Sequence, residues 1–322
     1  MRVLVTGGSG FIGTNIVEGF LERGDSVLSI DIAAPRNVDH IAVYREVDIM
    51  DRQSLGIVFD DFRPEAVLHF AARAVLEEHK GLEHFDTNIT GVRNIIDAVR
   101  ATGGVRRTIF ASTRLVFDLG YEPRHETDYS ASTLYGVSKA RGEDIVRAAS
   151  DDLDVWTIVR PTGIWGPWFG EPYRSFFEMV ERGMYVNPSS RAVHKGYGYV
   201  GNSVHQLHRL LEAPKELVHE KTFWLADYQP VVVAEWASQI AEAFGSRPIR
   251  RVPYAALRVA AAAGDALARI GVRFPMTSFR LNNLTTDMTF DMSGTEAVAG
   301  PLPFSLDQGT VLTIDWLRSH RG

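Results

Sequence analysis

The residues with the clearest chemical potential are Tyr135 and Lys139, which lie in the stretch STLYGVSK (132–139). Side chains four residues apart share one face of a helix, so the phenol and the ammonium can meet. A fixed positive charge favours the phenolate form of tyrosine, and a phenolate can remove a proton from an alcohol. The same spacing also occurs in ordinary surface pairs, so the remaining sequence has to decide between the two interpretations.

Composition favours the chemical interpretation of this pair. The chain has ten tyrosines and only five lysines, at positions 80, 139, 195, 215 and 221. Chance placement predicts about 0.15 Tyr-x-x-x-Lys sequences in such a chain. Lysine is a compact charge with a flexible stem, which suits a role beside a phenol and a ribose better than arginine does. The pair is therefore not a product of composition.

Charge and cysteine usage exclude several classes of function. The net charge is −6 and there is no cluster of basic residues, so neither nucleic acid nor an anionic membrane is an expected partner. Without cysteine there is no disulfide, no thiolate nucleophile and no Cys-based metal site. His205 and His208 alone do not make a metal site, so no metal is expected. The N-terminal MRVLVTGG lacks the pattern of a signal peptide, and we expect a cytoplasmic protein.

A glycine-rich segment, TGGSGFIG (6–13), joins the first expected strand to the first expected helix. Gly7, Gly10 and Gly13 would let backbone N–H groups approach a pyrophosphate at the helix N-terminus. Asp31 ends the second expected strand, where a carboxylate can accept hydrogen bonds from an adenosine ribose. A carboxylate there repels a 2′-phosphate, so NAD is favoured over NADP, although Arg36 follows closely and could receive a phosphate.

The order of elements predicts a Rossmann-type α/β fold, a doubly wound parallel sheet with helices on both faces. Expected strands cover 2–6, 26–31, 42–48, 66–72, 107–113 and 155–161, and expected helices cover 11–24, 51–62, 81–103 and 132–150. After a Gly/Pro/aromatic loop at 163–175 the pattern loosens, which predicts a smaller C-terminal α+β substrate-binding cap. We expect the NAD-binding domain over 1–165 with return segments near 196–228, and the cap over 166–195 and 229–322.

With these motifs in place, the chain resembles the extended short-chain dehydrogenase/reductase family, in particular its NAD-dependent nucleotide-sugar epimerase/dehydratase group and, within it, the 4-epimerases. The resemblance rests on TGGSGFIG, Asp31, VDI (47–49), HFAA (69–72), Asn88, FAST (110–113), the Tyr135–Lys139 pair and RPTGIWGP (160–167). It implies NAD contacts at Gly7, Gly10, Phe11, Ile12, Gly13, Asp31, Asp48, Ile49, Phe70, Ala71, Ala72, Asn88, Tyr135, Lys139 and Pro161. Asp48 has the alternative role of N-cap of the next helix.

The resemblance also implies the catalytic and substrate residues. Tyr135 is the base, Lys139 orients the ribose and supports Tyr135, and Thr113 is the hydroxyl that bonds the reacting oxygen, with Ser112 as the alternative. In this family's dehydratases and decarboxylases acids follow that hydroxyl, whereas this chain has Arg114 and Leu115, which excludes both reactions. The implied substrate contacts are Arg73, Thr113, Arg114, Thr162, Gly163, Lys195 and Arg280.

Three departures from the family pattern bear on the substrate. Gly163 stands where an asparagine usually contacts the substrate diphosphate, Lys195 replaces an arginine, and Asn202 replaces an acid. The expected function is an NAD-dependent 4-epimerase of a nucleotide sugar, a small-molecule substrate, acting by transient oxidation and re-reduction. Two alternatives are a dehydrogenase or ketoreductase of a sterol-like or other bulky alcohol, and a non-catalytic NAD-binding regulatory protein. By analogy with the family, we expect a homodimer.

Overall fold

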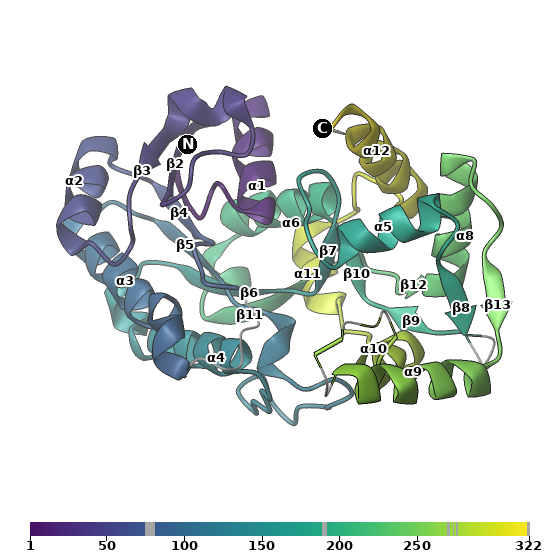
Figure 1. The fold of residues 1–322 in the computed structure, drawn as a ribbon. Helices are drawn as coiled ribbons and strands as arrows, with labels where there is room; N and C mark the ends of the chain where they lie inside the picture. The colour runs from purple at the N-terminus through teal and green to yellow at the C-terminus, as the bar shows by residue number, and fades with distance from the viewer. Residues whose placement is uncertain (75–80, 189–191, 269–270, 273, 275, 321–322) are drawn as a thin grey trace. The chain divides into compact units, whose positions relative to one another are not determined.

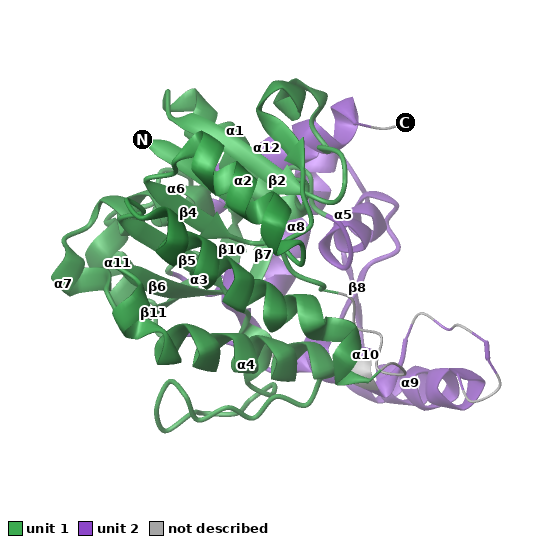
Figure 2. Cartoon of the chain, turned by 90° about the vertical axis from the view of Figure 1, so that its left-hand side faces the viewer, with its two compact units in different colours: residues 1–169, 198–228, 291–305 green, residues 170–197, 229–290, 306–322 purple. Residues whose placement is uncertain are grey.

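The computed structural model describes residues 1–74, 81–188, 192–268, 271–272, 274 and 276–320. Its contacts divide the chain into two compact units, coloured separately in Figure 2. Unit 1 contains residues 1–169, 198–228 and 291–305, and unit 2 contains residues 170–197, 229–290 and 306–322. Each unit is therefore assembled from segments that are distant in the sequence.

Unit 1 is built on a seven-stranded parallel sheet, with helices on both faces (Figure 1). The strand order is β11-β6-β5-β4-β1-β2-β3. The predicted Rossmann-type α/β fold is thus confirmed. The strands are β1 (Arg2–Thr6), β2 (Ser26–Asp31), β3 (Tyr44–Glu46), β4 (Ala66–His69), β5 (Arg107–Ala111), β6 (Trp156–Pro161) and β11 (Lys221–Leu225).

Two hydrophobic clusters explain why the strands read as continuous apolar runs. On one face, Phe20 of α1 (Phe11–Glu22) and Leu207 of α6 (Val200–Glu212) pack against alternate strand residues such as Val5. On the other face, α2 (Arg52–Phe62), α3 (Thr90–Thr102) and α4 (Leu134–Ala148) cover residues such as Leu4. Strands buried on both faces lose the polar alternation of a half-exposed sheet.

The direction of winding changes between β1 and β4, which lie side by side. The chain runs from β1 outward to β2 and β3, then returns to β4 and continues outward through β5 and β6 to β11. Thr6, the last residue of β1, pairs in register with His69, the last residue of β4. In open parallel sheets, ligands bind outside the carboxyl ends of the strands at such a switch point.

The segment 81–103 was predicted as one helix, and this prediction is wrong. It forms a 3₁₀ helix, η2 (Leu82–Asn88), followed by α3, with Ile89 between them at φ −113° and ψ −66°. Asn88 lies at the break because its side chain accepts from Arg73 N at 2.8 Å and donates to Arg73 O at 3.0 Å. These bonds hold the end of η2 against the loop that follows β4.

The segment 163–175 was predicted as a loop throughout, and this too is corrected. β7 (Gly163–Trp165) occupies its first residues and pairs with β10 (Tyr197–Tyr199), whose last two residues belong to unit 1. α5 (Tyr173–Glu181) begins within its end. Unit 1 also contains η1 (Val38–Val43), η3 (Arg114–Val116), η4 (Ser150–Asp152), α7 (Lys215–Val218) and α11 (Ser293–Ala299).

Unit 2 has its own core around Trp236. This residue of α8 (Val233–Phe244) packs on Phe177 of α5, with ring centroids 5.5 Å apart, and donates from Nε1 to Thr310 Oγ1 of α12 (Leu306–Ser319) at 3.0 Å. Two small sheets pair β9 (His194–Lys195) with β12 (Val231–Val232) and β8 (Val186–Pro188) with β13 (Arg250–Val252). The remaining helices are α9 (Tyr254–Ala268) and α10 (Ser278–Thr285). None of the described helices has the length and apolar character needed to cross a membrane.

Candidate active site

The turn after β1 brings three segments of backbone into close contact. Gly7 has φ +74°, and a Cβ on it would lie 2.5 Å from Ala71 N in the loop after β4. A Cβ on Gly13 would collide with the carbonyl oxygen of Gly7. Glycine is therefore required at both positions, because any side chain would push the loop away from the helix and from the neighbouring strand. This tight approach is the geometry that a bound pyrophosphate needs.

The first turn of α1 leaves backbone donors for an anion. Its N-cap is Gly10, which has no side chain to accept from the N–H groups of the first turn, where Phe11 and Ile12 lie. Gly10 N donates to Gly7 O at 3.0 Å, which fixes the start of the helix under the loop. Unpaired N–H groups and the helix dipole together favour a phosphate at this end. The arrangement fits the pyrophosphate of NAD.

Asp31 is placed to receive the adenosine ribose. Its Oδ2 accepts from Ser9 N at 3.1 Å and its Oδ1 accepts from Ala33 N at 3.0 Å. A carboxylate has about four acceptor positions, so two remain for the ribose hydroxyls. Arg36 points elsewhere: its Nε donates to Ser9 O and its Nη1 to Trp168 O, both at 2.9 Å. The neighbouring cation therefore binds backbone carbonyls, in agreement with NAD.

Asp48 and Ile49 lie in the loop after β3. Asp48 is exposed and its Oδ1 accepts from Met50 N at 2.9 Å. The N-cap of α2 is Asp51, which accepts from two first-turn N–H groups, so the alternative role of Asp48 as N-cap is wrong. Ile49 is buried and its carbonyl accepts from Asn94 Nδ2 at 3.0 Å. Both remain predicted NAD contacts, with Ile49 turned into the core.

The loop after β4 carries Phe70, Ala71 and Ala72 past the glycine turn. Phe70 N donates to Thr6 O at 3.0 Å and Ala71 N donates to Thr6 Oγ1 at 3.1 Å. These bonds press the loop against the end of β1, beside Gly7. Pro161 ends β6, so it also lies at the carboxyl edge of the sheet. The predicted NAD residues of β1, β4 and β6 thus share one edge.

Helix α4 presents Tyr135 and Lys139 on successive turns. Thr133 caps the helix by accepting from Gly136 N at 3.0 Å. Ser138 Oγ donates to Tyr135 O at 2.7 Å and accepts from Asn88 Nδ2 at 2.8 Å, so the helix is tied to the end of η2. Asn88 was predicted to contact NAD. Within the described residues its side chain bonds Arg73 and Ser138, and so connects the loop after β4 to α4.

The two candidate hydroxyls after β5 point to different partners. The side chain of Thr113 lies near the phenol of Tyr135 and lowers its pKa, and its Oγ1 also accepts from Leu115 N at 3.2 Å. Ser112 Oγ instead donates to Glu143 Oε1 at 2.5 Å. Neighbouring residues on an extended backbone face opposite sides, so only one of the two can reach the phenol. This favours Thr113 over Ser112 as the hydroxyl that would share the reacting oxygen with Tyr135.

Burial controls the ionisation of the tyrosine and lysine. Burial raises the pKa of Tyr135 to about 12, and the Thr113 hydrogen bond works against this. Burial lowers the pKa of Lys139 to about 8, and the carboxylate of Glu143 works against that shift. The sequence predicted that Lys139 would lower the pKa of Tyr135. In the protein alone burial dominates, so the phenol is protonated at neutral pH and needs further positive charge to ionise.

His69 lies behind the site as a neutral residue. Burial, and secondly the charge of Lys139, lower its pKa to about 3. Its Nδ1 lies 2.8 Å from Thr6 Oγ1, and its ring packs edge-on against Phe110 at 5.9 Å. An imidazole with so low a pKa is a very weak base at neutral pH, and His69 is 1% exposed, so it is part of the core.

The predicted substrate residues fall in both units. Arg73, Arg114, Thr162 and Gly163 belong to unit 1, and Lys195 and Arg280 belong to unit 2, where Lys195 is buried in β9 and Arg280 is exposed on α10. Their shared role stays a prediction.

Within unit 1 the predicted substrate residues differ in what they offer. Arg73 Nε is buried and has no hydrogen-bond partner among the described residues, so it can receive an anion. Arg114 begins η3, directly after Thr113. Thr162 Oγ1 donates to Leu225 O of β11 at 3.1 Å, so its hydroxyl hydrogen is already used within the protein. Gly163 is the first residue of the buried strand β7.

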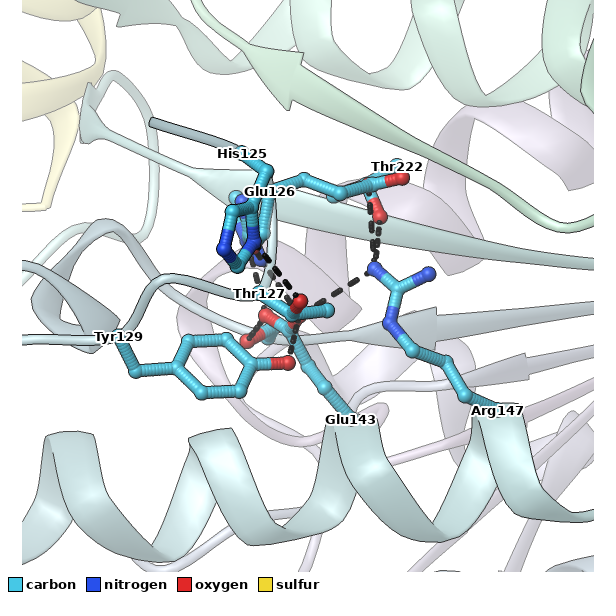
Figure 3. Close-up of polar contacts among 9 residues, drawn as sticks. His125, Glu126, Thr127, Tyr129, Glu143, Arg147 and Thr222 are labelled. Carbon is cyan, nitrogen blue, oxygen red and sulfur yellow. Dashed lines mark hydrogen bonds and ion pairs between the residues drawn. The ribbon is translucent and has the colours of Figure 1, made fainter. Parts of the chain in front are cut away.

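Sequence reasoning missed the polar group behind Lys139. Glu143 and Arg160 are both 2% exposed and form a hydrogen-bonded ion pair, with Nη2 2.6 Å from Oε2. Tyr129 OH donates to the same carboxylate oxygen at 3.0 Å, and Figure 3 shows Tyr129 and Glu143 pointing toward one another. The available signal was a glutamate four residues after Lys139, on the buried face of the helix. No group of acids and histidines in the described part of the chain could hold a metal ion.

Comparison with known proteins agrees with this geometry. Residues 3–226 match the model of the NAD dependent epimerase/dehydratase family. A UDP-glucose 4-epimerase of Erwinia amylovora is 34% identical over 162 residues, which is 46% of this chain and about half (48%) of that protein. A 3β-hydroxysteroid dehydrogenase/Δ5→4-isomerase of Mycobacterium tuberculosis is 29% identical over 276 residues, covering 80% of this chain and 73% of that protein.

A solved structure matches the whole chain. The UDP-glucose 4-epimerase of Thermus thermophilus, in complex with NAD, superposes with a TM-score of 0.73 and 25% identity, covering 99% of this chain and 100% of that one. The glycine turn, the uncapped helix and Asp31 fit the same cofactor. The family model, the fold and the cofactor geometry agree, and the chain is an NAD-dependent member of the epimerase/dehydratase family of extended short-chain dehydrogenases/reductases.

Proposed function

We propose that the protein is a nucleotide-sugar 4-epimerase, which oxidises the C4 hydroxyl of its substrate transiently and reduces it again. The observation that carries the oxidoreductase part is the interaction of the Thr113 side chain with the phenol of Tyr135, one helical turn from Lys139. This arrangement offers a proton acceptor and a hydroxyl to one oxygen atom. NAD, when bound, would supply the hydride acceptor and donor that the side chains lack.

The side chains divide the proton chemistry among them. Thr113 holds the substrate hydroxyl, and Tyr135 removes its proton as the carbon is oxidised. Lys139 contributes positive charge beside the phenol and orients the ribose hydroxyls, and the positive charge of NAD⁺, when bound, would add to it. After the ketone has turned over in the site, Tyr135 returns the proton to the new alkoxide. Because Leu115 cannot transfer protons, the chemistry stops at the oxidised carbon.

Three cations support a phosphate-bearing substrate. Arg73 offers a buried Nε without a partner among the described residues. Lys195 stands where the family pattern has an arginine that meets the diphosphate, and Arg280 supplies a second cation in this proposal. Binding of the sugar by the cap, residues 166–195 and 229–322, is part of this proposal. So is a homodimer, which rests on analogy with the family.

The decisive experiment combines product analysis with absorbance at 340 nm. UDP-, dTDP- and GDP-sugars are incubated with the purified protein, and the products are identified by NMR. Epimerisation gives the C4 epimer without net change at 340 nm, because the hydride returns to substrate. Absence of any epimer across the whole panel would contradict the proposal, whereas turnover that also occurs in Tyr135→Phe would contradict the assigned base.

The second candidate is a net dehydrogenase or ketoreductase of a bulky alcohol. The match to the steroid dehydrogenase extends over 73% of that protein, while the match to the Erwinia epimerase extends over 48%. The hydroxyl of Thr162 is committed to Leu225 O, and Gly163 has no side chain to contact a diphosphate. This function predicts stoichiometric NADH from a sterol-like alcohol. Binding of NAD without turnover of either class would instead indicate a regulatory protein.

A further inference from the structure

Glu143 occupies an unusual position for a carboxylate. It is 2% exposed and lies on α4 one turn beyond Lys139. Its Oε1 accepts from Ser112 Oγ at 2.5 Å and from Arg160 Nε at 2.8 Å. Its Oε2 accepts from Arg160 Nη2 at 2.6 Å and from Tyr129 OH at 3.0 Å. All four acceptor positions of the carboxylate are therefore taken.

The donors come from three separate segments and are themselves fixed. Ser112 follows β5, Arg160 belongs to β6, and Tyr129 precedes α4. The guanidinium of Arg160 lies 4.9 Å from the ring centre of Phe117 and also donates to the backbone oxygen of Glu126 at 2.6 Å. Figure 3 shows Glu143 rising from α4 toward Tyr129 and Glu126. The carboxylate is thus a fixed negative charge that cannot swing toward Lys139.

Lys139 and Glu143 line one small cavity. Its other lining residues are Ser112 and apolar residues, among them Val92 of α3 and Ile158 of β6. Such surroundings screen charges far less than bulk water does, so a carboxylate one turn away acts strongly on a buried ammonium. Within the described residues the ammonium of Lys139 makes no hydrogen bond, so it depends on through-space interactions.

We propose that Glu143 is a positioning residue that keeps Lys139 protonated under the conditions in which Tyr135 works, and that Ser112, Tyr129 and Arg160 hold its carboxylate in place for this purpose. The proposal rests on the proposed function only for the use that is made of the Lys139 charge. It gives Ser112 a role through Glu143 rather than on the substrate.

The charged and titratable groups around Lys139 support this assignment. His69 faces it from β4 and is neutral, and Tyr135 on its own helix is protonated in the protein alone. Among the described residues, Glu143 is the one acid that raises the pKa of Lys139. The carboxylate is ion-paired with Arg160 at 2.6 Å and lies 3.7 Å from Arg147 Nη2. Removing the carboxylate therefore removes the negative charge that favours the ammonium and leaves the buried cation of Arg160 without its counter-charge, and both effects favour the neutral amine.

The test is a direct titration of Lys139 in the protein without substrate. With five lysines in the chain, [¹³Cε]lysine labelling gives few NMR signals, and Lys139→Met identifies the relevant one. The wild-type signal should titrate near pH 8. In Glu143→Gln, which keeps the shape and removes the charge, the midpoint should fall by about one pH unit or more. An unchanged midpoint in folded Glu143→Gln would overturn the proposal.

Glu126→Gln is the matched control. Glu126 is a half-exposed acid of the same polar group, with its carboxylate 3.1 Å from Arg147 Nη2, and it does not appear among the groups that act on Lys139. The same chemical change there should leave the Lys139 midpoint in place. An equal shift in both variants would mean that Glu143 has no special position and would overturn the proposal.

A double variant covers the case in which Glu143→Gln does not fold. Replacing both members of a buried ion pair is commonly tolerated, whereas leaving one charge alone is not. Glu143→Gln/Arg160→Gln should still show a lowered midpoint for Lys139, because the favourable carboxylate is gone. A wild-type midpoint in this variant would refute the proposal. Since the titration needs no substrate, a shifted midpoint in a protein that turns over no sugar or sterol would reject the proposed function and leave this inference standing.

Discussion

At the scale of single residues, Tyr135 has to lose its phenolic proton although burial raises its pKa. We expect Tyr135→Phe to lower kcat by at least about 10²-fold, because general-base catalysis contributes about 10²–10⁴-fold. The affinity for NAD, measured by calorimetry, should change little, since the ring and its packing against Phe85 remain. A variant that loses NAD binding in proportion to activity would show a structural role instead.

Thr113 should be replaceable only by another hydroxyl. Thr113→Val keeps the shape and removes the hydroxyl that lowers the pKa of Tyr135, so the pKa of the phenol should rise further and kcat should fall about tenfold or more. Thr113→Ser should retain most of the activity. Steady-state rates of the two variants, compared at several pH values, check this. Equal rates for the valine and serine variants would exclude the hydroxyl from the reaction.

The two residues after β5 also show where sequence reasoning ends. Spacing placed Ser112 and Thr113 next to the end of a strand but gave no direction to either side chain. The side chain of Ser112 is directed by Glu143, which lies 31 positions away and accepts a hydrogen bond from its hydroxyl. Tyr135 and Lys139 were accessible to prediction because their relation is local, within one helix turn. A contact between residues of two different elements, such as Ser112 and Glu143, produces no regular spacing in the sequence.

At the scale of elements, the entry to α1 depends on the absence of side chains. We expect Gly13→Ala to weaken NAD binding by about tenfold or more, because its Cβ collides with the carbonyl oxygen of Gly7 and opens the turn. Gly56→Ala in α2 is the matched control, since its Cβ meets no atom within 4 Å. It should bind NAD as the wild type does. Calorimetric titration of both variants gives the comparison.

The elements themselves were largely predictable because both faces of the sheet are covered. Buried parallel strands read as short apolar runs, and the strand–helix alternation fixes the winding. The break at Ile89 was not predictable, because the helical pattern continues through it, whereas the side chain of Asn88 beside it bonds the backbone of Arg73 in a separate loop. A local polar bond from a distant loop overrides the intrinsic preference of the segment.

At the scale of the whole molecule, Asp227 links stability to pH. Burial raises its pKa to about 6, against the hydrogen bonds from Asn202 and Tyr199 N. A folded-state pKa above the unfolded value means that its contribution is fully present below about pH 4 and is lost as pH rises through 6. Asp227→Asn should therefore gain stability relative to wild type between pH 5 and pH 8, on the order of 1–3 kcal/mol. Urea unfolding at both pH values measures it, and a constant difference would contradict the assignment.

Arg36 sets a condition for anyone who wishes to redesign the cofactor preference of this protein. Its guanidinium bonds the carbonyls of Ser9 and Trp168, so it braces the glycine turn against a second loop of unit 1. Deleting the carboxylate of Asp31 alone would remove the repulsion of a 2′-phosphate without supplying a cation to replace it. A variant that prefers NADP would need a new arginine or lysine near the ribose, and Arg36 would have to keep its hydrogen bonds to Ser9 and Trp168.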